Sequence, residues 1–323
     1  MKFKITGIEK DTDTGTIDGD GNVIDAKGGT EMMKQGLVDR LDDNLLDQFN
    51  IIHSRVRNLS EDKKNILVLH DLCDDPEAVH LKDPESRARF EKLVFVSNWQ
   101  FQTYHARHGV PYSESIVLRN AIEPIEDHEK DMDGPINLIY HTTPHRGLEL
   151  LLPVYEVLHN KWGDKIHLDV YSSFNIYGWP QRDEQYKEVF DKCREHEGIT
   201  YHGSVPNIEI REALKKAHIF AYPSIWQETS CIAALEAMSA RCAVVCPNYA
   251  ALAETVNDFG LMYQWHEDPT MHANRHLQLL DAAITDYNNP RHMDKLNFQK
   301  IYVDNFYSWD SRIIEWENML INL

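Results

Sequence analysis

Short runs of β-branched and aromatic residues alternate with longer helical patterns, and this alternation limits the possible folds more than any other feature. We predict strands at residues 2–8, 49–53, 65–70, 92–98, 115–120, 136–141, 167–172, 199–203, 219–224, 242–247 and 260–264. Strands that alternate with helices are typical of parallel sheets joined by crossover helices. Because the runs are continuously apolar, we expect both faces of each sheet to be covered. The sequence therefore predicts an α/β fold built on parallel sheets.

The segment AIEPIEDHEKDMDGP, residues 121–135, interrupts this alternation. It is acidic, contains two prolines and a glycine, and shows no periodicity. These properties are typical of a linker between domains, and a length of 323 residues also favours two domains. We predict an N-terminal domain over residues 1–125, a C-terminal domain over 135–305, and a last helix over 306–323 that Ser308 or Asp310 caps.

The charge balance excludes two classes of partner. With 33 basic and 52 acidic residues, the net charge is −19, which argues against sequence-independent binding to nucleic acid or to an anionic membrane. No apolar stretch approaches the roughly 18 residues of a membrane-spanning helix. The start MKFKITGIEKD lacks the apolar core of a signal peptide. The five cysteines have no metal-binding spacing and suit free thiols in a reducing compartment, so we expect a cytoplasmic protein.

The Asp- and Gly-rich segment 11–29 has the composition of a calcium loop without its spacing. Counted from Asp18, the sixth position is Val23 where glycine is needed, and the twelfth is Gly29 where glutamate is needed. We therefore predict a β-hairpin with an Asp-Gly turn. The Asp-x-Asp triplets at 11–13, 18–20 and 131–133 lie in predicted loops, and we expect no metal site.

Residues 228–240, ETSCIAALEAMSA, predict a helix in which a single carboxylate, Glu236, lies among small and apolar side chains. A helix that is apolar all round is buried, and a buried carboxylate needs a partner. That partner is either a protein group or a ligand. The helix, capped by Thr229 or Ser230, follows a strand, where open α/β sheets bind ligands and helix amides bind phosphate. Glu228 lies at the same edge, so the two carboxylates and an anion site suit a nucleotide sugar.

Glu228 and Glu236 are separated by seven residues, and in this E-x7-E motif the chain resembles the retaining glycosyltransferases of family four. The similarity extends through residues 199–256, LIYHTTPHRGLELLL at 138–152, FVSNWQFQTY, VLRNAIEP and YSWDSRIIEWENML, and covers most of 65–323. The resemblance implies a GT-B fold, with two Rossmann-like domains facing each other across a cleft. It also implies that the C-terminal helix packs back toward the N-terminal domain.

The resemblance assigns roles to the two carboxylates and to the start of the helix. Glu236 would hold the ribose diol of the donor, so that a ligand would supply its missing partner. Glu228 would accept hydroxyl protons of the transferred sugar. The backbone amides of Thr229, Ser230 and Cys231 would face the diphosphate.

Arg146, in PHRG, takes the place of a basic residue that binds the diphosphate in the family. A guanidinium there would stabilise the charge on the leaving nucleoside diphosphate; a solvated surface arginine is the alternative. The chain departs from the family at His141, where a further arginine is frequent, so either the cationic clamp is weaker or Thr142 and Thr143 donate hydrogen bonds instead. It also has Arg241 where glycine usually ends the E-x7-E helix, which requires a left-handed arginine or a different helix end.

The N-terminal domain offers candidates on the other side of the predicted cleft. Gly28 and Gly29 precede a helix that Thr30 would cap, and in similar proteins this loop touches the donor; an ordinary loop that needs positive φ is the alternative. His70 ends the run ILVLH and would orient the acceptor or the transferred sugar, unless it only closes the strand. Ser97 follows the next strand and is expected to cap a helix.

The resemblance implies transfer of a sugar from a UDP- or GDP-linked donor to an acceptor hydroxyl, with retention, without metal and without cofactor. A nucleotide-sugar epimerase or hydrolase on the same fold is an alternative, and His70 with Asp71 keeps it open. A glycan phosphorylase would need a pyridoxal-phosphate lysine, for which no context is visible. A non-catalytic nucleotide-sugar binding protein is a further alternative, against which Glu228, Glu236 and Arg146 argue.

Overall fold

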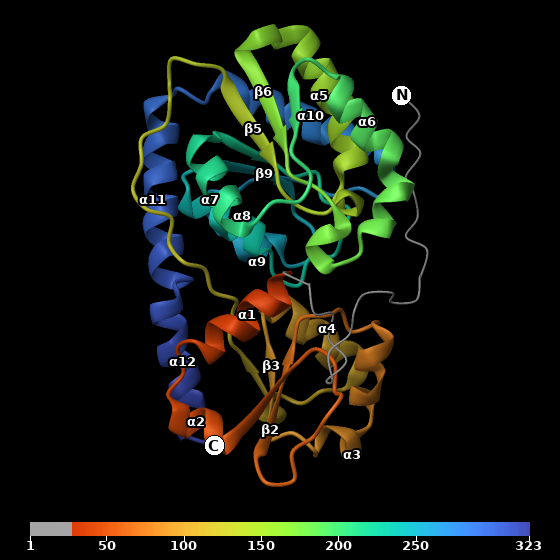
Figure 1. Cartoon of the computed structure of the whole chain (residues 1–323), viewed down its shortest axis with the longest axis vertical. Helices are drawn as coiled ribbons and strands as arrows, with labels where there is room; N and C mark the ends of the chain where they lie inside the picture. The colour runs from red at the N-terminus through yellow and green to blue at the C-terminus, as the bar shows by residue number, and fades with distance from the viewer. Residues whose placement is uncertain (1–27) are drawn as a thin grey trace.

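The computed structural model describes residues 28–323. The strand expected at 2–8 and residues 11–27 of the expected hairpin lie outside the described residues. Two lobes are stacked along the long axis of the molecule, each built around one sheet (Figure 1). All strand pairs in both sheets are parallel, which confirms the predicted α/β class.

The N-terminal lobe contains a four-stranded sheet in the order β1-β2-β3-β4. Its strands are β1 (Phe49–His53), β2 (Lys64–Leu69), β3 (Lys92–Phe95) and β4 (Ser115–Val117). Its helices are α1 (Gly29–Val38), α2 (Asp43–Gln48), α3 (Pro84–Arg87) and α4 (Asn98–His108). Ser97 caps α4, as predicted, because its side chain accepts a hydrogen bond from the amide of Gln100.

The C-terminal lobe contains a six-stranded sheet in the order β10-β9-β8-β5-β6-β7. Its strands are β5 (Ile136–Tyr140), β6 (Ile166–Val170), β7 (Ile199–Tyr201), β8 (Ile219–Ala221), β9 (Ala243–Pro247) and β10 (Leu261–Tyr263). Its helices are α5 (Leu148–Trp162), α6 (Lys187–Glu195), α7 (Asn207–Lys216), α8 (Ile232–Ser239), α9 (Leu252–Val256), α10 (Pro269–Thr285) and α11 (Pro290–Phe306).

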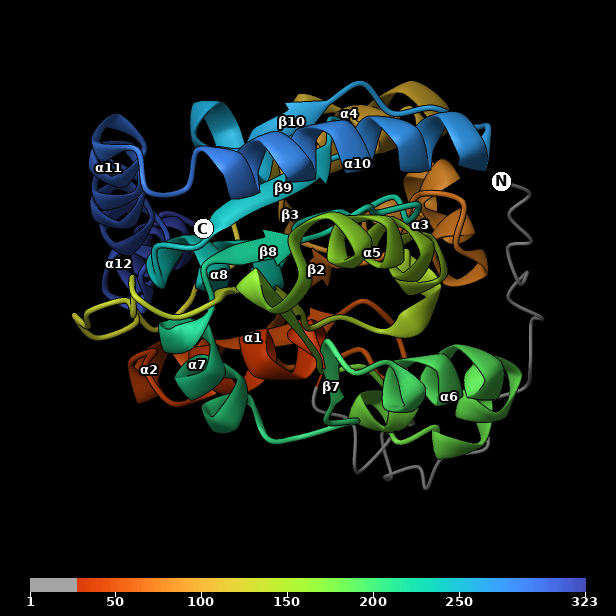
Figure 2. The same ribbon diagram turned by 90° about the horizontal axis from the view of Figure 1, so that it is seen from above.

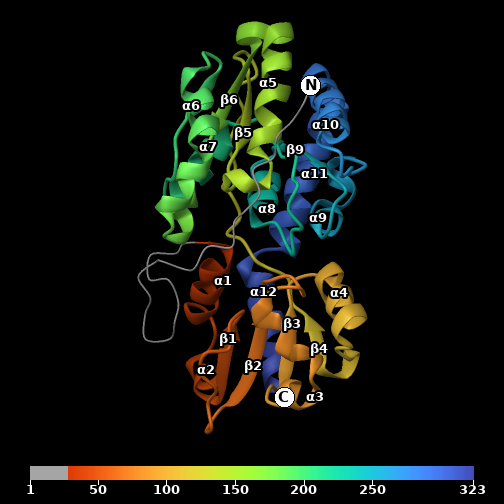
Figure 3. The same ribbon diagram turned by 90° about the vertical axis from the view of Figure 1, so that its right-hand side faces the viewer.

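The strand order of this sheet reverses between β5 and β8. The crossovers through α5 and α6 move along the sheet in one direction and the later ones move in the other, so right-handed connections place their helices on opposite faces. Accordingly, α5 contacts α6 and α10, whereas α8 contacts α7 and α11, and helices cover the sheet on both sides (Figures 2 and 3). Double coverage explains why these strands are continuous apolar runs.

The last helix, α12 (Trp309–Ile321), returns to the N-terminal lobe (Figure 1). Trp309 and Trp316 pack there with Met33 and Leu37 of α1 in one buried cluster. Ser308 caps the helix, as predicted. The packing is tight, because a Cβ on Gly36 of α1 would lie 2.0 Å from the ring of Trp309. The expectation that this helix packs back onto the first lobe is therefore confirmed.

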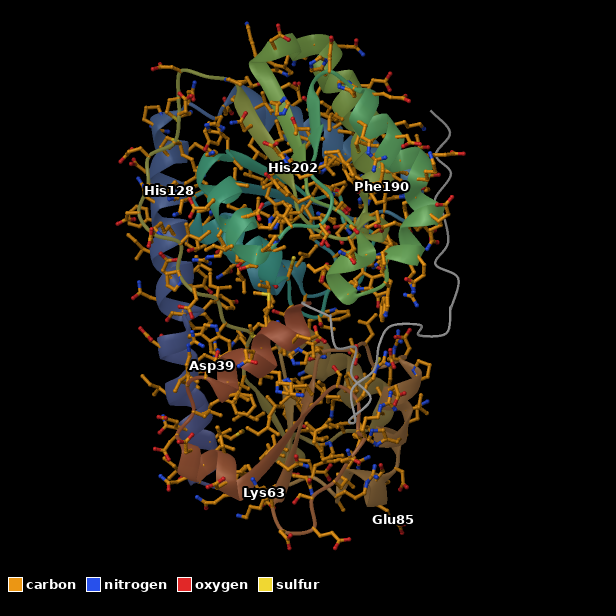
Figure 4. The ribbon with its side chains drawn as sticks, viewed as in Figure 1. Asp39, Lys63, Glu85, His128, Phe190 and His202 are labelled. Carbon is orange, nitrogen blue, oxygen red and sulfur yellow. The ribbon has the colours of Figure 1, made fainter. Side chains whose placement is uncertain are left out.

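The acidic segment 121–135 runs alongside α11 between the two lobes (Figures 1 and 4). Its described residues form no helix or strand, but hydrogen bonds to neighbouring elements fix its position. The amide of Ile122 donates to the carbonyl oxygen of Tyr307 at 2.8 Å. The buried Lys130 donates to the carbonyl oxygen of Leu214 at 2.8 Å. Nε2 of His128 lies 3.1 Å from the carbonyl oxygen of Ala240. These hydrogen bonds therefore fix the segment to the end of α11 and to the C-terminal lobe.

Two smaller expectations also meet the structure. Arg241 takes the left-handed conformation, with φ of 57°, directly after α8. The five cysteines are free and buried. Among residues 28–323, no helix has the length and apolar character needed to cross a membrane.

Candidate functional site

The switch point between β5 and β8 brings two loops together. Open α/β sheets bind ligands at the carboxyl ends of their strands where the strand order reverses. The loop after β5 contains Arg146, whose carbonyl oxygen accepts a hydrogen bond from the amide of Ile225, in the loop after β8, at 3.1 Å. Gly147 has φ of 136°, and a Cβ there would lie 2.4 Å from the carbonyl oxygen of Pro223. Only glycine permits this approach, so the two loops are held in contact.

Arg146 and Glu228 form a buried ion pair at this point. Nη1 of Arg146 donates to Oε1 of Glu228, and the hydroxyl of Tyr222 donates to the same oxygen. The remaining guanidinium nitrogens also have partners, since Nε donates to Oγ1 of Thr143 at 3.2 Å and Nη2 donates to the hydroxyl of Tyr177 at 3.3 Å. The side chains of Arg146 and Glu228 are only 20% and 5% exposed, so Arg146 is not a solvated surface arginine.

The environment keeps Arg146 charged. Burial lowers the pKa of this guanidinium, but the carboxylate of Glu228 more than offsets burial, and the pKa is raised. Nearby, burial lowers the pKa of His141 to about 3 and holds that of His145 well below its usual value. Nε2 of His141 and Nδ1 of His145 are buried and have no hydrogen-bond partner among the described residues. Thr142 lies in the same loop and is half-buried.

Glu236 is buried in α8, but it does not lack protein partners. Nδ2 of Asn207 donates to its two carboxylate oxygens at 3.1 and 3.2 Å, and Nη1 of Arg211 lies 3.6 Å from Oε1. Burial raises the pKa of Glu236, whereas Asn207 and Arg211 oppose the rise. A protein cation therefore accounts for the buried carboxylate, and the expectation that its missing partner must be a ligand is not supported.

The start of α8 differs from the prediction. The helix begins at Ile232, its N-cap is Cys231, and no side chain of the described residues caps it. The predicted capping by Thr229 or Ser230 is wrong, because Oγ1 of Thr229 donates instead to the carbonyl oxygen of His70 at 2.7 Å. That bond joins the two lobes. The first amides of α8 thus lie at the switch point without a side-chain acceptor from residues 28–323.

His70 forms a pair with a second histidine that the sequence did not reveal. Nε2 of His70 lies 3.1 Å from Nδ1 of His53, and their rings are stacked with centroids 5.4 Å apart. Burial lowers the pKa of His70 to about 4 and, together with His70, holds that of His53 well below its usual value. Both rings are therefore neutral at pH 7. Because β1 and β2 are parallel neighbours, residues at their carboxyl ends meet at one edge, which is the signal that could have found His53.

Gly28 and Gly29 reach the C-terminal lobe. The helix α1 begins at Gly29 with Gly28 as N-cap, so the predicted cap Thr30 is wrong. Gly28 has φ of −72°, and glycine is needed there for close approach rather than for positive φ. A Cβ on Gly28 would lie 2.6 Å from the ring of Tyr177, and one on Gly29 would lie 3.1 Å from Ile232. Since Tyr177 also contacts Arg146, the first lobe reaches the ion-pair site through Tyr177.

The structure thus gathers Arg146, Glu228 and Thr143 at the switch point and places His70, Gly28 and Thr229 at the contact between lobes. The sequence did not reveal five side chains that contact site residues. His53, Tyr177 and Tyr222 contact His70, Arg146 and Glu228, and Asn207 and Arg211 contact Glu236. No group of three or more His, Cys, Asp or Glu side chains with metal-binding geometry occurs among residues 28–323. A cavity of about 430 Å³ lies beside β1, is bordered by Lys34, Phe49 and Lys63, and also reaches His53.

Comparisons with known proteins agree with this architecture. A family model described as glycosyl transferases group 1 matches residues 123–299, the region that carries the switch point. A search of curated proteins found no match.

Solved structures share the fold at low sequence identity. A glycosyltransferase from Rickettsia africae ESF-5 is 14% identical, with a TM-score of 0.68 over 97% of this chain and 83% of that one. HepE from Anabaena, solved with UDP and glucose, is 12% identical, with a TM-score of 0.60 over 81% and 72%. TarM is 16% identical, with a TM-score of 0.60 over 88% of this chain, which spans 56% of TarM.

Proposed function

The chain belongs to the glycosyl transferases group 1 family, whose model matches more than half of it, and we propose that it is a retaining, metal-independent member. It would move a sugar from a UDP- or GDP-linked donor to an acceptor hydroxyl. The observation that carries this proposal is the buried Arg146–Glu228 pair at the switch point of the C-terminal sheet. A buried cation and a carboxylate at one edge suit a substrate that joins a diphosphate to a sugar.

Arg146 would bind the diphosphate and stabilise the negative charge that develops on the leaving group. It is charged, held by three neighbours, and placed beside the uncapped amides at the start of α8. Helix amides and a guanidinium together favour an anion. The amides of Thr229, Ser230 and Cys231 and the hydroxyls of Thr142 and Thr143 would complete this side of the site. The positive charge comes from the protein, so the proposed transfer needs no metal ion.

Glu228 would accept hydroxyl protons of the transferred sugar, and Glu236 would hold the ribose. The contacts of Glu236 with Asn207 and Arg211 do not oppose this role. An ionised carboxylate offers about four lone-pair positions, of which Asn207 occupies two. Arg211 favours the ionised form that accepts ribose hydroxyls. The role of Glu236 therefore depends on the family resemblance and on its remaining acceptor capacity, and no longer on an unpaired charge.

The N-terminal lobe would supply the other face of the site through His70, Gly28 and Gly29. Gly28 touches Tyr177, the partner of Arg146, and Thr229 holds the backbone of His70. A neutral His70 can orient a sugar or acceptor hydroxyl through one hydrogen bond. Its low pKa makes it a poor general acid near pH 7, which argues against the epimerase alternative.

The proposal is tested first with a thermal-shift screen of nucleoside diphosphates and their sugars, because a ligand that binds the folded protein raises its stability. The donor that binds is then incubated with and without acceptor, with and without EDTA, and the anomeric configuration of the product is read by NMR. We expect transfer with retention that EDTA does not abolish. Inversion at the anomeric carbon, epimerised donor, or strict dependence on a divalent ion would each overturn the corresponding part of the proposal.

Variants test the residue assignments. Glu236→Ala should weaken nucleoside diphosphate binding about 10- to 100-fold, the cost of hydrogen bonds to a charged group. Arg146→Ala should slow transfer about 100- to 1000-fold, as for loss of one oxyanion-stabilising donor. Glu85→Ala, an exposed site at the far end of the N-terminal lobe (Figure 4), is the matched control. Calorimetric titration that shows parent-like binding in both site variants would refute the assignments.

A further inference from the structure

Each nitrogen of the Arg146 guanidinium has a protein partner. Its three nitrogens contact Glu228, Thr143 and Tyr177, and its side chain is largely buried. These contacts use three of the five N–H donors, so a diphosphate that approaches Arg146 either binds the remaining N–H groups beside Glu228 or replaces one of these partners. Of the three, Glu228 alone carries a charge.

The single positive charge of the guanidinium cannot neutralise both a diphosphate and Glu228. Like charges that converge in a poorly solvated site repel strongly, and no second cation contacts Glu228 in the described part of the chain. Replacing the carboxylate by a phosphate keeps the guanidinium paired throughout, and the released Glu228 is then stabilised by the hydroxyl of Tyr222 and by the hydroxyls of the transferred sugar. Thr143 and Tyr177 are neutral, and displacing them would leave the repulsion between the two anions in place.

Glu228 has a partner that remains when it leaves Arg146. The hydroxyl of Tyr222 donates to Oε1 of Glu228, and the ring of Tyr222 is fully buried in the segment that follows β8. This contact is local, since Tyr222 precedes Glu228 by six residues. Tyr222 is therefore a positioning residue that holds the carboxylate near the switch point in either arrangement.

We propose that Glu228 and the donor diphosphate compete for the guanidinium of Arg146, so that donor binding releases Glu228 to accept hydrogen bonds from the transferred sugar. This inference depends on the proposed function, because it assumes a nucleoside diphosphate ligand. It makes the readiness of Glu228 a consequence of donor binding. Loss of a site residue usually weakens ligand binding, but here removing the charge of Glu228 should strengthen nucleoside diphosphate binding while it impairs transfer.

The test is calorimetric titration of UDP and of GDP into the parent and into Glu228→Gln. We expect the variant to bind whichever nucleotide the parent binds roughly tenfold more tightly, a discounted value for one charge-assisted hydrogen bond. Glu114→Gln is the matched control, because it alters another carboxylate paired with a buried arginine, Arg87, in the N-terminal lobe. That control should bind as the parent does.

The outcomes separate the two proposals. If the parent binds neither nucleotide, the proposed function fails and the competition fails with it. If the parent binds but Glu228→Gln binds equally or more weakly, the competition is wrong while the proposed function stands. Thermal unfolding followed by circular dichroism shows whether the variant is folded. Should it not fold, Glu228→Ala also removes the charge that competes for Arg146, and it must then bind more tightly than the parent.

Discussion

Glu254, in α9 of the C-terminal lobe, caps α4 of the N-terminal lobe. One carboxylate oxygen accepts from the amide and the side chain of Asn98 at 3.0 and 2.9 Å, and the other accepts from the amide of Trp99 at 3.0 Å. Nη2 of Arg119 donates to the first oxygen at 3.0 Å. Orphan amides at a helix start need acceptors, and here one lobe supplies them to the other. We therefore expect Glu254→Ala to weaken the contact between the lobes.

The size of this effect follows from the contacts that are lost. Removing a helix cap costs about 1 kcal/mol. The ion pair with Arg119 is partly exposed, at 24% and 22% for the two side chains, so it contributes at most about 1 kcal/mol. The sum of about 2 kcal/mol lowers the ratio of molecules with the lobes in contact to molecules with the lobes apart roughly 25-fold. Glu254→Gln keeps an acceptor oxygen and should have a smaller effect.

Small-angle scattering and energy transfer between dyes on the two lobes measure this change directly. We expect a larger radius of gyration in Glu254→Ala and a slower transfer reaction, because His70 and Gly28 would face the donor less often. Glu114→Ala removes a carboxylate–arginine contact within the N-terminal lobe and should leave the scattering unchanged. Identical scattering and transfer rates in parent and Glu254→Ala would refute the reasoning.

Two further predictions concern stability. Gly147→Ala should lower the free energy of unfolding by about 2–4 kcal/mol through a strained φ and overlap with Pro223. Gly109→Ala, in the left-handed α conformation but with open space around it, should cost about 1 kcal/mol. Equal losses of the two variants in urea denaturation would contradict this. Both ring nitrogens of His276 lack hydrogen-bond partners among residues 28–323, and burial lowers the pKa of this histidine to about 3. Below pH 6.5, His276 is therefore protonated in the unfolded chain but not in the folded protein. The free energy of unfolding therefore decreases as pH falls from 6.5 toward 3. Between pH 7.5 and 5, the free energy of unfolding of His276→Leu should decrease by about 2 kcal/mol less than that of the parent. Equal decreases in parent and variant, measured by urea denaturation at the two pH values, would contradict this.

Local sequence rules predicted the features that depend on neighbours in the chain. Alternating apolar runs predicted parallel sheets, and Ser97 and Ser308 cap the helices that follow them. Arg241 takes the left-handed conformation because the chain ends α8 as other helices do, even without glycine.

Features that depend on contact between distant segments could not be predicted this way. Thr229 does not cap α8, because its hydroxyl is used by the backbone of His70 in the other lobe. Asn207 and Arg211 contact Glu236 from a different helix, and no spacing in the sequence predicts these contacts. Tyr222 is hidden in the apolar run after β8, where a buried strand residue is the ordinary interpretation.

The return of α12 to the N-terminal lobe has a consequence for the order of folding. Trp309, Trp316, Met319 and Leu320 complete a core whose other members come from residues 33–121. During synthesis the core of the first lobe stays incomplete, and its apolar surface stays exposed, until the whole second lobe has been translated. The second lobe can bury its own core earlier, and contacts between segments so far apart in the chain form slowly. We therefore expect the lobe that is translated first to mature last, and a nascent chain stalled before Trp309 to recruit chaperones through that surface.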